Sequence, residues 1–172
     1  MQMPKMETER LIIRPTREAD GTACLDIWLD DEMGKYMADP PRDKADEDEL
    51  NFAVGIETQD GWYPMVVIHK ETGGFLGTCS VIPKDNDTRW DFGYAVHKKY
   101  WRQGYATEFL TKLIETGKER GIRSFTANVA KENEASNAVM KKLGFRVIKE
   151  DKSYCKRFTD IVYPEYTYLL EI

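Results

Sequence analysis

The fold is decided by the stretch Tyr100-Trp101-Arg102-Gln103-Gly104-Tyr105-Ala106-Thr107. It separates a strand pattern at Arg89–Val96 from the clearest helical pattern of the chain, at residues 106–117. Glycine and alanine let the backbone approach a ligand closely, and the unpaired N–H groups and dipole of a first helical turn suit a pyrophosphate. The stretch therefore predicts a phosphate-binding loop. The alternative is an ordinary helix start in which a glycine eases a tight turn.

Hydrophobic spacing and turn residues on both sides of this loop predict an ordered series of strands and helices. We expect strands at residues 10–14, 62–69, 75–82, 89–96, 124–129, 145–149 and 162–170. We expect helices at residues 46–59, 106–117 and 135–143, and another that Thr16 caps and that runs through Trp28. Gly121 and Gly144 follow the last two helices at positions typical of C-terminal caps. The three strands that end at Val96 predict an antiparallel meander.

Composition limits the classes of function that the chain can have. With 172 residues, 41% of them hydrophobic, and no repeat or linker, residues 1–172 are expected to form a single domain. The formal net charge of -5 gives no basic footprint for nucleic acid, and the apolar runs are too short to cross a membrane. We therefore expect a cytoplasmic protein with no nucleic-acid or membrane partner.

The cysteines and histidines form no recognisable metal site or nucleophile motif. Cys24, Cys79 and Cys155 are widely spaced and make no CxxC pair, so we expect reduced thiols and no bound metal. His69 and His97 have no serine or cysteine nearby in a nucleophile motif, which disfavours a triad hydrolase.

A second block, Asn133-Glu134-Ala135-Ser136-Asn137-Ala138-Val139-Met140-Lys141-Lys142-Leu143-Gly144-Phe145, follows the loop one strand later. The two blocks in this order resemble the GNAT superfamily of N-acetyltransferases, and within it the branch of ribosomal-protein N-terminal acetyltransferases. The opening TERLIIRP, the strand WDFGYAV, the loop YWRQGYATEFL and the helix NEASNAVMKKLGF are all similar to that branch. Trp101 departs from the glutamine or arginine of the general GNAT loop, and tryptophan is familiar there in this branch.

The resemblance implies an α+β fold of mixed α/β type, in which helices flank a strongly bent mixed sheet of about seven strands. The fourth and fifth strands, here residues 89–96 and 124–129, are expected to splay apart and to admit the pantetheine arm of acetyl-CoA. The implied contacts are the backbone of Val96 and the loop amides, with Asn133 on the other side of the arm. The residues implied in binding acetyl-CoA are Val96, Arg102, Gln103, Gly104, Tyr105, Ala106, Thr107 and Asn133. Arg102 or Lys99 either meets a phosphate or is a solvated cation.

The implied activity is transfer of an acetyl group to a primary amine by direct attack on the thioester. Such a reaction needs a neutral amine, a donor for the tetrahedral oxyanion and a proton for the departing thiolate. Asp91 is the candidate base, because the family often places a glutamate in this strand. The alternative is an exposed strand carboxylate that faces solvent or pairs with Arg89. The backbone N–H of Val96 is the candidate donor to the oxyanion.

The proton for the thiolate has a less familiar candidate. Many relatives have a tyrosine in the helix of the second block, but Met140 occupies that position here. Ser136 resembles a serine that the ribosomal-protein branch places close to the cofactor sulfur, and the alternative is a serine that caps the helix. Tyr94, Tyr154 and Tyr166 are further hydroxyls near such a cleft, although strand aromatics are more often core.

The acceptor amine is the least defined part of the prediction. Several aromatic and methionine side chains either line an acceptor pocket or fill the core: Trp28, Met33, Tyr36, Met37, Trp62 and Tyr63. The acidic run at residues 43–49 either attracts a cationic amine or is a solvated helix face. The acceptor is either a protein N-terminus or a small-molecule amine. The protein is either a monomer or a homodimer. The rival functions are a catalytically silent acyl-CoA-binding or regulatory module and a plain interaction domain.

Overall fold

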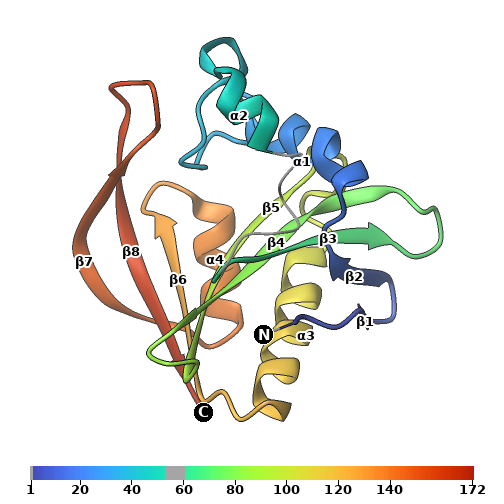
Figure 1. Ribbon diagram of the computed structural model, residues 1–172. Coiled ribbons are helices and arrows are strands. Elements are labelled where there is room, and N and C mark those ends of the chain that lie inside the picture. Colours follow the sequence, from blue (N-terminus) through green and yellow to red (C-terminus); the bar gives the residue numbers. More distant parts are fainter. Residues whose placement is uncertain (1, 53–60) are drawn as a thin grey trace.

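The structure is a computed structural model that describes residues 2–52 and 61–172. Its centre is a mixed sheet of eight strands in the order β1-β2-β3-β4-β5-β6-β8-β7, with helices on both faces (Figure 1). The strands are β1 Met6–Glu7, β2 Leu11–Pro15, β3 Tyr63–His69, β4 Phe75–Lys84, β5 Arg89–Val96, β6 Ser124–Ala130, β7 Arg146–Cys155 and β8 Val162–Glu171. The helices are α1 Gly21–Trp28, α2 Glu47–Phe52, α3 Tyr105–Glu119 and α4 Glu134–Lys142.

The strand predictions are confirmed, with two differences at the edges of the sheet. β3, β4 and β5 form the expected antiparallel meander, and the turn between β4 and β5 has positive φ at Asp85, Asn86 and Asp87. β7 extends to Cys155, beyond the expected residue 149, because it pairs with β8 in spite of two register shifts. The two-residue strand β1 adds an eighth strand, and a segment so short has no periodicity from which to predict it.

The N-terminal helices differ from the sequence prediction. Thr16 does not cap a helix, since its hydroxyl donates to the carbonyl oxygen of Pro64 at 2.7 Å and ties the end of β2 to β3. A short 3-10 turn at Glu18–Asp20 follows instead, and α1 begins at Gly21. The helix predicted at residues 46–59 is present as α2, and the part of the prediction at residues 53–59 lies outside the described residues.

Side-chain alternation along the strands gives each face of the sheet its own core. On one face, Trp90 and Phe92 of β5 pack with Phe109 and Leu113 of α3 and Met140 of α4. On the other face, Ala95 of β5 joins a smaller cluster built on α1, with the members Cys24, Leu25, Ile27, Trp28, Leu29 and Val66. Side chains of β5 at even positions therefore face α3 and α4, and those at odd positions face α1.

Helix α3 lies close to the sheet because glycine faces it. A Cβ at Gly117 would come within 2.6 Å of the Phe125 ring and 3.1 Å of the Trp90 ring, so only glycine fits without a shift. The helix ends as the sequence predicts, with Gly121 at a φ of 87° and its N–H donating to the carbonyl of Lys118. This packing fixes where the N-terminus of α3 meets the end of β5.

Candidate active site

The site is built on a split between two neighbouring parallel strands. β5 and β6 pair from Arg89 and Ser124 up to Phe92 and Ala127, and no further pair joins them, although β5 continues to Val96 and β6 to Ala130. In Figure 1 the two strands lie together at their lower ends and diverge upward. The splay expected for residues 89–96 and 124–129 is thus present.

The free edge of β5 offers backbone groups to this split. His97 N–H donates to the Leu76 carbonyl at 2.8 Å, and Val96 lies opposite Gly77 in the ladder. Because hydrogen-bonded and non-bonded pairs alternate in an antiparallel ladder, the N–H groups of Tyr94 and Val96 point away from β4 and toward the split. The Val96 carbonyl accepts a hydrogen bond from Trp101 Nε1 at 2.6 Å, so the unusual tryptophan anchors the loop to the strand end.

The predicted phosphate loop runs from this strand end to the N-terminus of α3. Arg102 and Gly104 both have left-handed backbone, with φ of 59° and 80°. Gly104 is the N-terminal cap residue of α3, and its carbonyl accepts from the N–H of Glu108. The N–H groups of Tyr105, Ala106 and Thr107 therefore precede the first intrahelical bond and face the helix end.

The space outside this helix end suits a phosphate group. An added Cβ at Gly104 would meet no heavy atom closer than Arg10 Nη2, at 3.6 Å. The Gln103 side chain bonds to the Lys99 carbonyl at 3.1 Å, and the Arg102 side chain is exposed. The loop thus offers backbone amides to an anion, and the splay offers a strand edge to a pantetheine arm, so the residues present fit acetyl-CoA.

The N-terminus of α4 closes the α3 side of the split. Asn133 caps the helix by accepting from the N–H of Ser136 at 3.2 Å, so Ser136 is not the capping residue. Asn137, which the sequence analysis did not single out, is buried and donates through Nδ2 to the carbonyls of Ala130, Lys131 and Asn133. Asn137 thereby fixes the helix start to the end of β6.

The Ser136 hydroxyl has a specific partner across the split. Its Oγ lies 2.6 Å from the hydroxyl of Tyr94, whose ring packs edge-on against Phe109 of α3. Burial raises the pKa of Tyr94 to about 12, and the hydrogen bond with Ser136 opposes that rise. A neutral, proton-bearing phenol therefore stands next to Ser136, and this pairing is absent from the sequence prediction.

Asp91 lies on the opposite face of β5. It is half-buried and accepts from the Thr126 hydroxyl at 2.6 Å, across the last paired section of β5 and β6. Burial raises the pKa of Asp91, while the Thr126 hydrogen bond and the charges of Lys84, Lys152 and Arg89 lower it by less. Arg89 pairs instead with Asp85, at 3.0 Å, so the predicted alternative of an Asp91–Arg89 ion pair is not observed.

A second carboxylate shares this face. Glu165 of β8 lies opposite Ala130 of β6 and Lys152 of β7. Burial raises its pKa, the charge of Lys152 lowers it, and the charge of Asp91 raises it further. No sequence signal marked Glu165, because its place beside Asp91 depends on the pairing of β6 with β8.

The aromatic and methionine residues expected on the acceptor side are either core or half-buried. Trp28 is buried, with its Nε1 donating to the Thr78 hydroxyl at 3.0 Å, and Tyr63 packs against the α3 side, so both are core. Tyr36 is half-buried, packs edge-on against Tyr163 and donates to the Glu132 carbonyl at 3.4 Å. The other three, Met33, Met37 and Trp62, are half-buried beside the α1 cluster.

The segment around Tyr36 is fastened to the β7–β8 hairpin. Lys156 is buried, and its Nζ donates to the carbonyls of Gly34 at 2.8 Å and Met37 at 3.1 Å. Burial lowers the pKa of Lys156, and the charges of Asp39 and Asp31 oppose that change. Tyr154 adds a hydrogen bond of 2.7 Å to the Tyr36 carbonyl.

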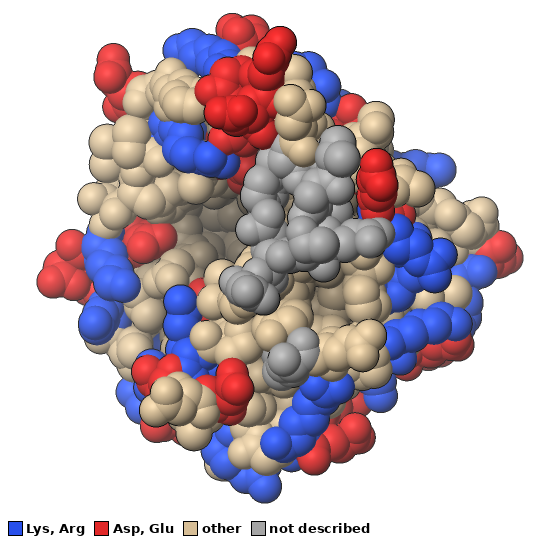
Figure 2. Space-filling view, viewed as in Figure 1, with Lys and Arg blue, Asp and Glu red and all other residues tan. Residues whose placement is uncertain are grey.

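The surface is hollowed beside this hairpin. Figure 2 shows the hollow between the β7–β8 hairpin and α2, with acidic side chains gathered over α2. Glu49 of the acidic run is buried and forms an ion pair with Arg157 of the hairpin, while Asp43, Glu47 and Asp48 are exposed. The acidic run is therefore partly structural.

The part of the chain that the structure describes has neither a metal-binding cluster nor a membrane-spanning helix. Across residues 2–52 and 61–172, no three His, Cys, Asp or Glu side chains group closely enough to hold a metal ion. None of the helices in that part of the chain is long and apolar enough to cross a membrane. Cys24, Cys79 and Cys155 are free thiols, and the first two are buried.

Comparison with known proteins decides the family. The family model described as "Acetyltransferase (GNAT) domain" matches residues 10–146. The chain belongs to the GNAT acetyltransferase family. An uncharacterized N-acetyltransferase, p20 of Bacillus licheniformis, is 29% identical over 151 residues, which are 84% of this chain and 83% of that protein.

Solved structures show the same GNAT fold. The acetyl transferase of Salmonella typhimurium that modifies the N-terminal serine of ribosomal protein L7/L12 superposes with a TM-score of 0.75 at 18% identity, covering 96% of both chains. The spermidine N-acetyltransferase of Vibrio cholerae, in complex with CoA and spermine, gives a TM-score of 0.76 at 14% identity, covering 95% of this chain and 96% of that one. The predicted resemblance to GNAT proteins is confirmed, and the chain is an acetyltransferase. Ribosomal-protein acetyltransferases are among the structures that share its fold.

Proposed function

We propose that this GNAT protein transfers the acetyl group of acetyl-CoA to a primary amine by direct attack on the thioester. The observation that carries the proposal is the convergence of the split between β5 and β6 with the open N-terminus of α3 at Gly104. A strand edge with free N–H groups suits an extended amide-containing arm, and a helix start with free N–H groups suits a pyrophosphate. Acetyl-CoA contains both in sequence, with the thioester at the far end of the arm.

The two faces of β5 supply the two proton transfers of the reaction, removal of a proton from the amine and donation of a proton to the thiolate. Asp91 faces the α1 side, and we assign it to take the proton of the attacking amine, directly or through water. Its raised pKa brings a carboxylate closer to the basicity that a general base needs near neutral pH. A side-chain amine has a reference pKa of about 10.4 and a chain terminus about 7.7–8.0, so a base matters more for the former.

The thiolate leaves on the other face, where Tyr94 and Ser136 meet. We assign Ser136 Oγ–H as the donor to the departing sulfur, with the Tyr94 hydroxyl 2.6 Å behind it to return the proton. The C–S bond breaks as the C–N bond is retained, the sulfur takes the serine proton, and the tyrosine proton replaces it. The resulting phenolate is reprotonated from solvent.

The oxyanion of the tetrahedral intermediate needs a donor between these two faces. The N–H of Val96 points into the split, and a backbone donor fixed by a ladder needs no reorganisation as charge develops. Asn133 and the amides from Arg102 to Thr107 hold the cofactor in this proposal. Base, oxyanion donor and acid are thereby spread across the split.

The acceptor is a protein N-terminus or a small-molecule amine. The two similar structures named above act on one of each: the Salmonella protein on the N-terminal serine of L7/L12, the Vibrio protein on spermidine. The hollow between the β7–β8 hairpin and α2 is the surface on which we place either acceptor. Asp91 and Glu165 share one face of the sheet. A neighbouring pair of carboxylates favours an amine that arrives as a cation.

Turnover separates an enzyme from a catalytically silent acyl-CoA-binding module. Purified protein is incubated with acetyl-CoA and a panel of peptides with free N-termini and of polyamines, and thiol release is followed. Transfer predicts release that depends on one class of amine. Binding of CoA without amine-dependent release would favour the silent module, and no binding of CoA at all would overturn the proposal.

A further inference from the structure

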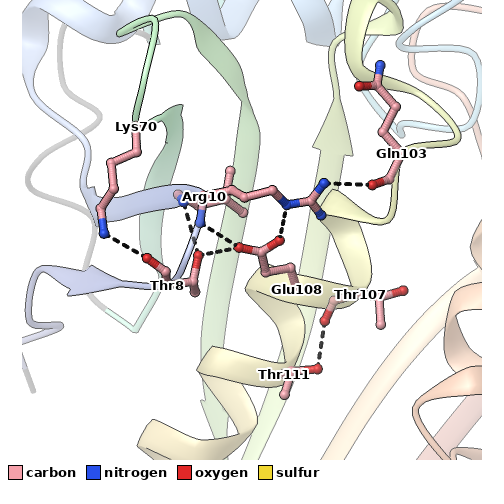
Figure 3. A network of polar contacts seen from close by, with 8 residues as sticks. Thr8, Arg10, Lys70, Gln103, Thr107, Glu108 and Thr111 are labelled. Atoms are coloured by element: carbon pink, nitrogen blue, oxygen red, sulfur yellow. Dashed lines mark hydrogen bonds and ion pairs between the residues drawn. The ribbon is translucent and has the colours of Figure 1, made fainter.

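A polar network joins the beginning of the chain to the phosphate loop (Figure 3). Arg10 precedes β2, and its guanidinium lies beside the first turn of α3, 98 residues along the chain. Its Nε pairs with Glu108 Oε2 at 2.6 Å, and its Nη1 donates to the Gln103 carbonyl at 3.1 Å. The guanidinium carbon lies 4.1 Å from the centre of the Tyr105 ring. One side chain thus contacts both the loop and the first turn of α3.

Glu108 is held from several directions by the N-terminal segment. Thr8 Oγ1 donates to its Oε1 at 2.5 Å, and the Arg10 backbone N–H donates to the same oxygen at 3.1 Å. Burial raises the pKa of Glu108, but the hydrogen bonds from Thr8 and Arg10 and the Arg10 charge outweigh it, so the pKa is lowered overall. The carboxylate is therefore ionised and neutralised by Arg10.

This neutralisation matters because of where Glu108 lies. An anion in the first turn of a helix competes for the same positive end that would bind a phosphate, and without a partner it would repel one. Arg10 occupies both carboxylate oxygens through its Nε and its backbone N–H. The helix end is thereby left free for another anion.

One nitrogen of the Arg10 guanidinium, Nη2, is not used in the network. Among the described residues, Arg10 Nη2 makes no hydrogen bond, and this atom is 3.6 Å from the place of a Cβ on Gly104. The side chain is 39% exposed, so the donor is open to a ligand. Charge-assisted bonds of a guanidinium to phosphate are among the strongest in proteins.

We propose that Arg10, oriented by Glu108, is a cofactor-positioning residue that holds the Gln103 carbonyl in place and presents Nη2 to the phosphates of acetyl-CoA. The inference rests on the proposed function, because it needs acetyl-CoA at the N-terminus of α3. It assigns the first residue of the RLIIRP segment to the phosphates and adds a charged side chain to a site otherwise made of backbone amides.

The test compares acetyl-CoA with S-acetylpantetheine, which has the same thioester and arm but lacks the CoA pyrophosphate. Arg10→Met is expected to raise KM for acetyl-CoA by about 10- to 100-fold, the loss of one or more charge-assisted hydrogen bonds, with kcat little changed. Its kcat/KM for S-acetylpantetheine should stay at the wild-type value. Equal losses with both thioesters would show a general structural defect and overturn the inference.

Lys70→Met is the matched control. Lys70, directly after β3, is a similarly exposed cation. Its Nζ donates to the Thr8 carbonyl at 2.7 Å and pairs with Glu7, and it has no hydrogen bond or ion pair with the loop. Its removal should change KM for acetyl-CoA by no more than about twofold. A loss as large as that of Arg10→Met would mean that net charge alone is responsible, against the inference.

A second substitution gives a signed outcome. In the Arg10→Met background Glu108 is an unpaired anion beside the phosphates, so adding Glu108→Gln should recover part of the lost affinity for CoA in a calorimetric titration. If Arg10 were only structural, the second substitution would add to the damage. Failure of the wild-type protein itself to bind CoA would refute the proposed function, whereas wild-type binding with unchanged binding by Arg10→Met would refute this inference alone.

Discussion

Two glycines at opposite ends of α3 allow ligand contact to be separated from backbone strain. Gly104 and Gly121 have φ of 80° and 87°, and a Cβ would meet only Arg10 Nη2, at 3.6 Å, at the first and nothing within 4 Å at the second. Alanine at either place is therefore strained by its left-handed backbone and by little else. We expect each variant to lose about 1–2 kcal/mol of unfolding free energy, or roughly 2–8 °C in Tm.

The two variants should differ in cofactor affinity. At Gly104 a methyl group occupies the space in which the amides of Tyr105 and Ala106 would approach a pyrophosphate. The loss of one charge-assisted hydrogen bond raises Kd by about tenfold or more. Gly104→Ala should therefore bind CoA at least about tenfold more weakly, and Gly104→Glu should not bind it. Gly121→Ala should bind like the wild type. Calorimetric titration with CoA, beside thermal unfolding, measures both; wild-type affinity in a folded Gly104→Ala would refute the loop assignment.

The remaining predictions concern the proton-transfer groups and the acceptor side. Asp91→Asn should reduce turnover by roughly 10²- to 10⁴-fold, and the loss should shrink at high pH, where more amine is already neutral. The same variant should be more stable than the wild type at neutral pH. Because folding raises the pKa of Asp91, the wild-type protein has its full stability below the unfolded-state pKa of this carboxyl and loses stability as the pH rises through the folded-state pKa. The gain in Tm of Asp91→Asn should therefore vanish in acid. Tyr94→Phe and Ser136→Ala should each lower kcat by less than Asp91→Asn, with the double variant no slower than the worse single one, since both act in one proton path; additive losses in kcat would contradict the pairing. Lys156→Met should raise KM for the amine while leaving KM for acetyl-CoA unchanged, and an unchanged amine KM would show that the segment around Tyr36 does not shape the acceptor site.

The sequence predicts the parts of this fold that local chemistry controls. Alternating apolar residues locate β3 to β6, helical spacing locates α3, and glycine at positions 121 and 144 adopts the positive φ expected after a helix. The turn at Gly104 is predicted because its left-handed backbone favours glycine. A conformation that requires glycine leaves a mark in the sequence.

The pairings at the site leave no such mark. Tyr94 meets Ser136 only because the first turn of α4 lies beside β5. Lys156 reaches the Gly34 carbonyl only because β7 and β8 extend as a long hairpin. Arg10 and Glu108 are 98 residues apart. Such contacts depend on tertiary placement, and neither propensity nor spacing encodes them, so Tyr94 reads from sequence as an ordinary strand aromatic.

The fate of a labelled acetyl carbon tests the central claim most directly. Acetyl-CoA carrying ¹³C at the acetyl carbonyl is incubated with the protein and with peptide or polyamine acceptors, and the carbonyl resonance is followed by NMR. The account predicts that the label moves from thioester to amide on a primary amine, and that Gly104→Glu abolishes this transfer. A label that stays as thioester with every acceptor, or that appears only as free acetate, would contradict it.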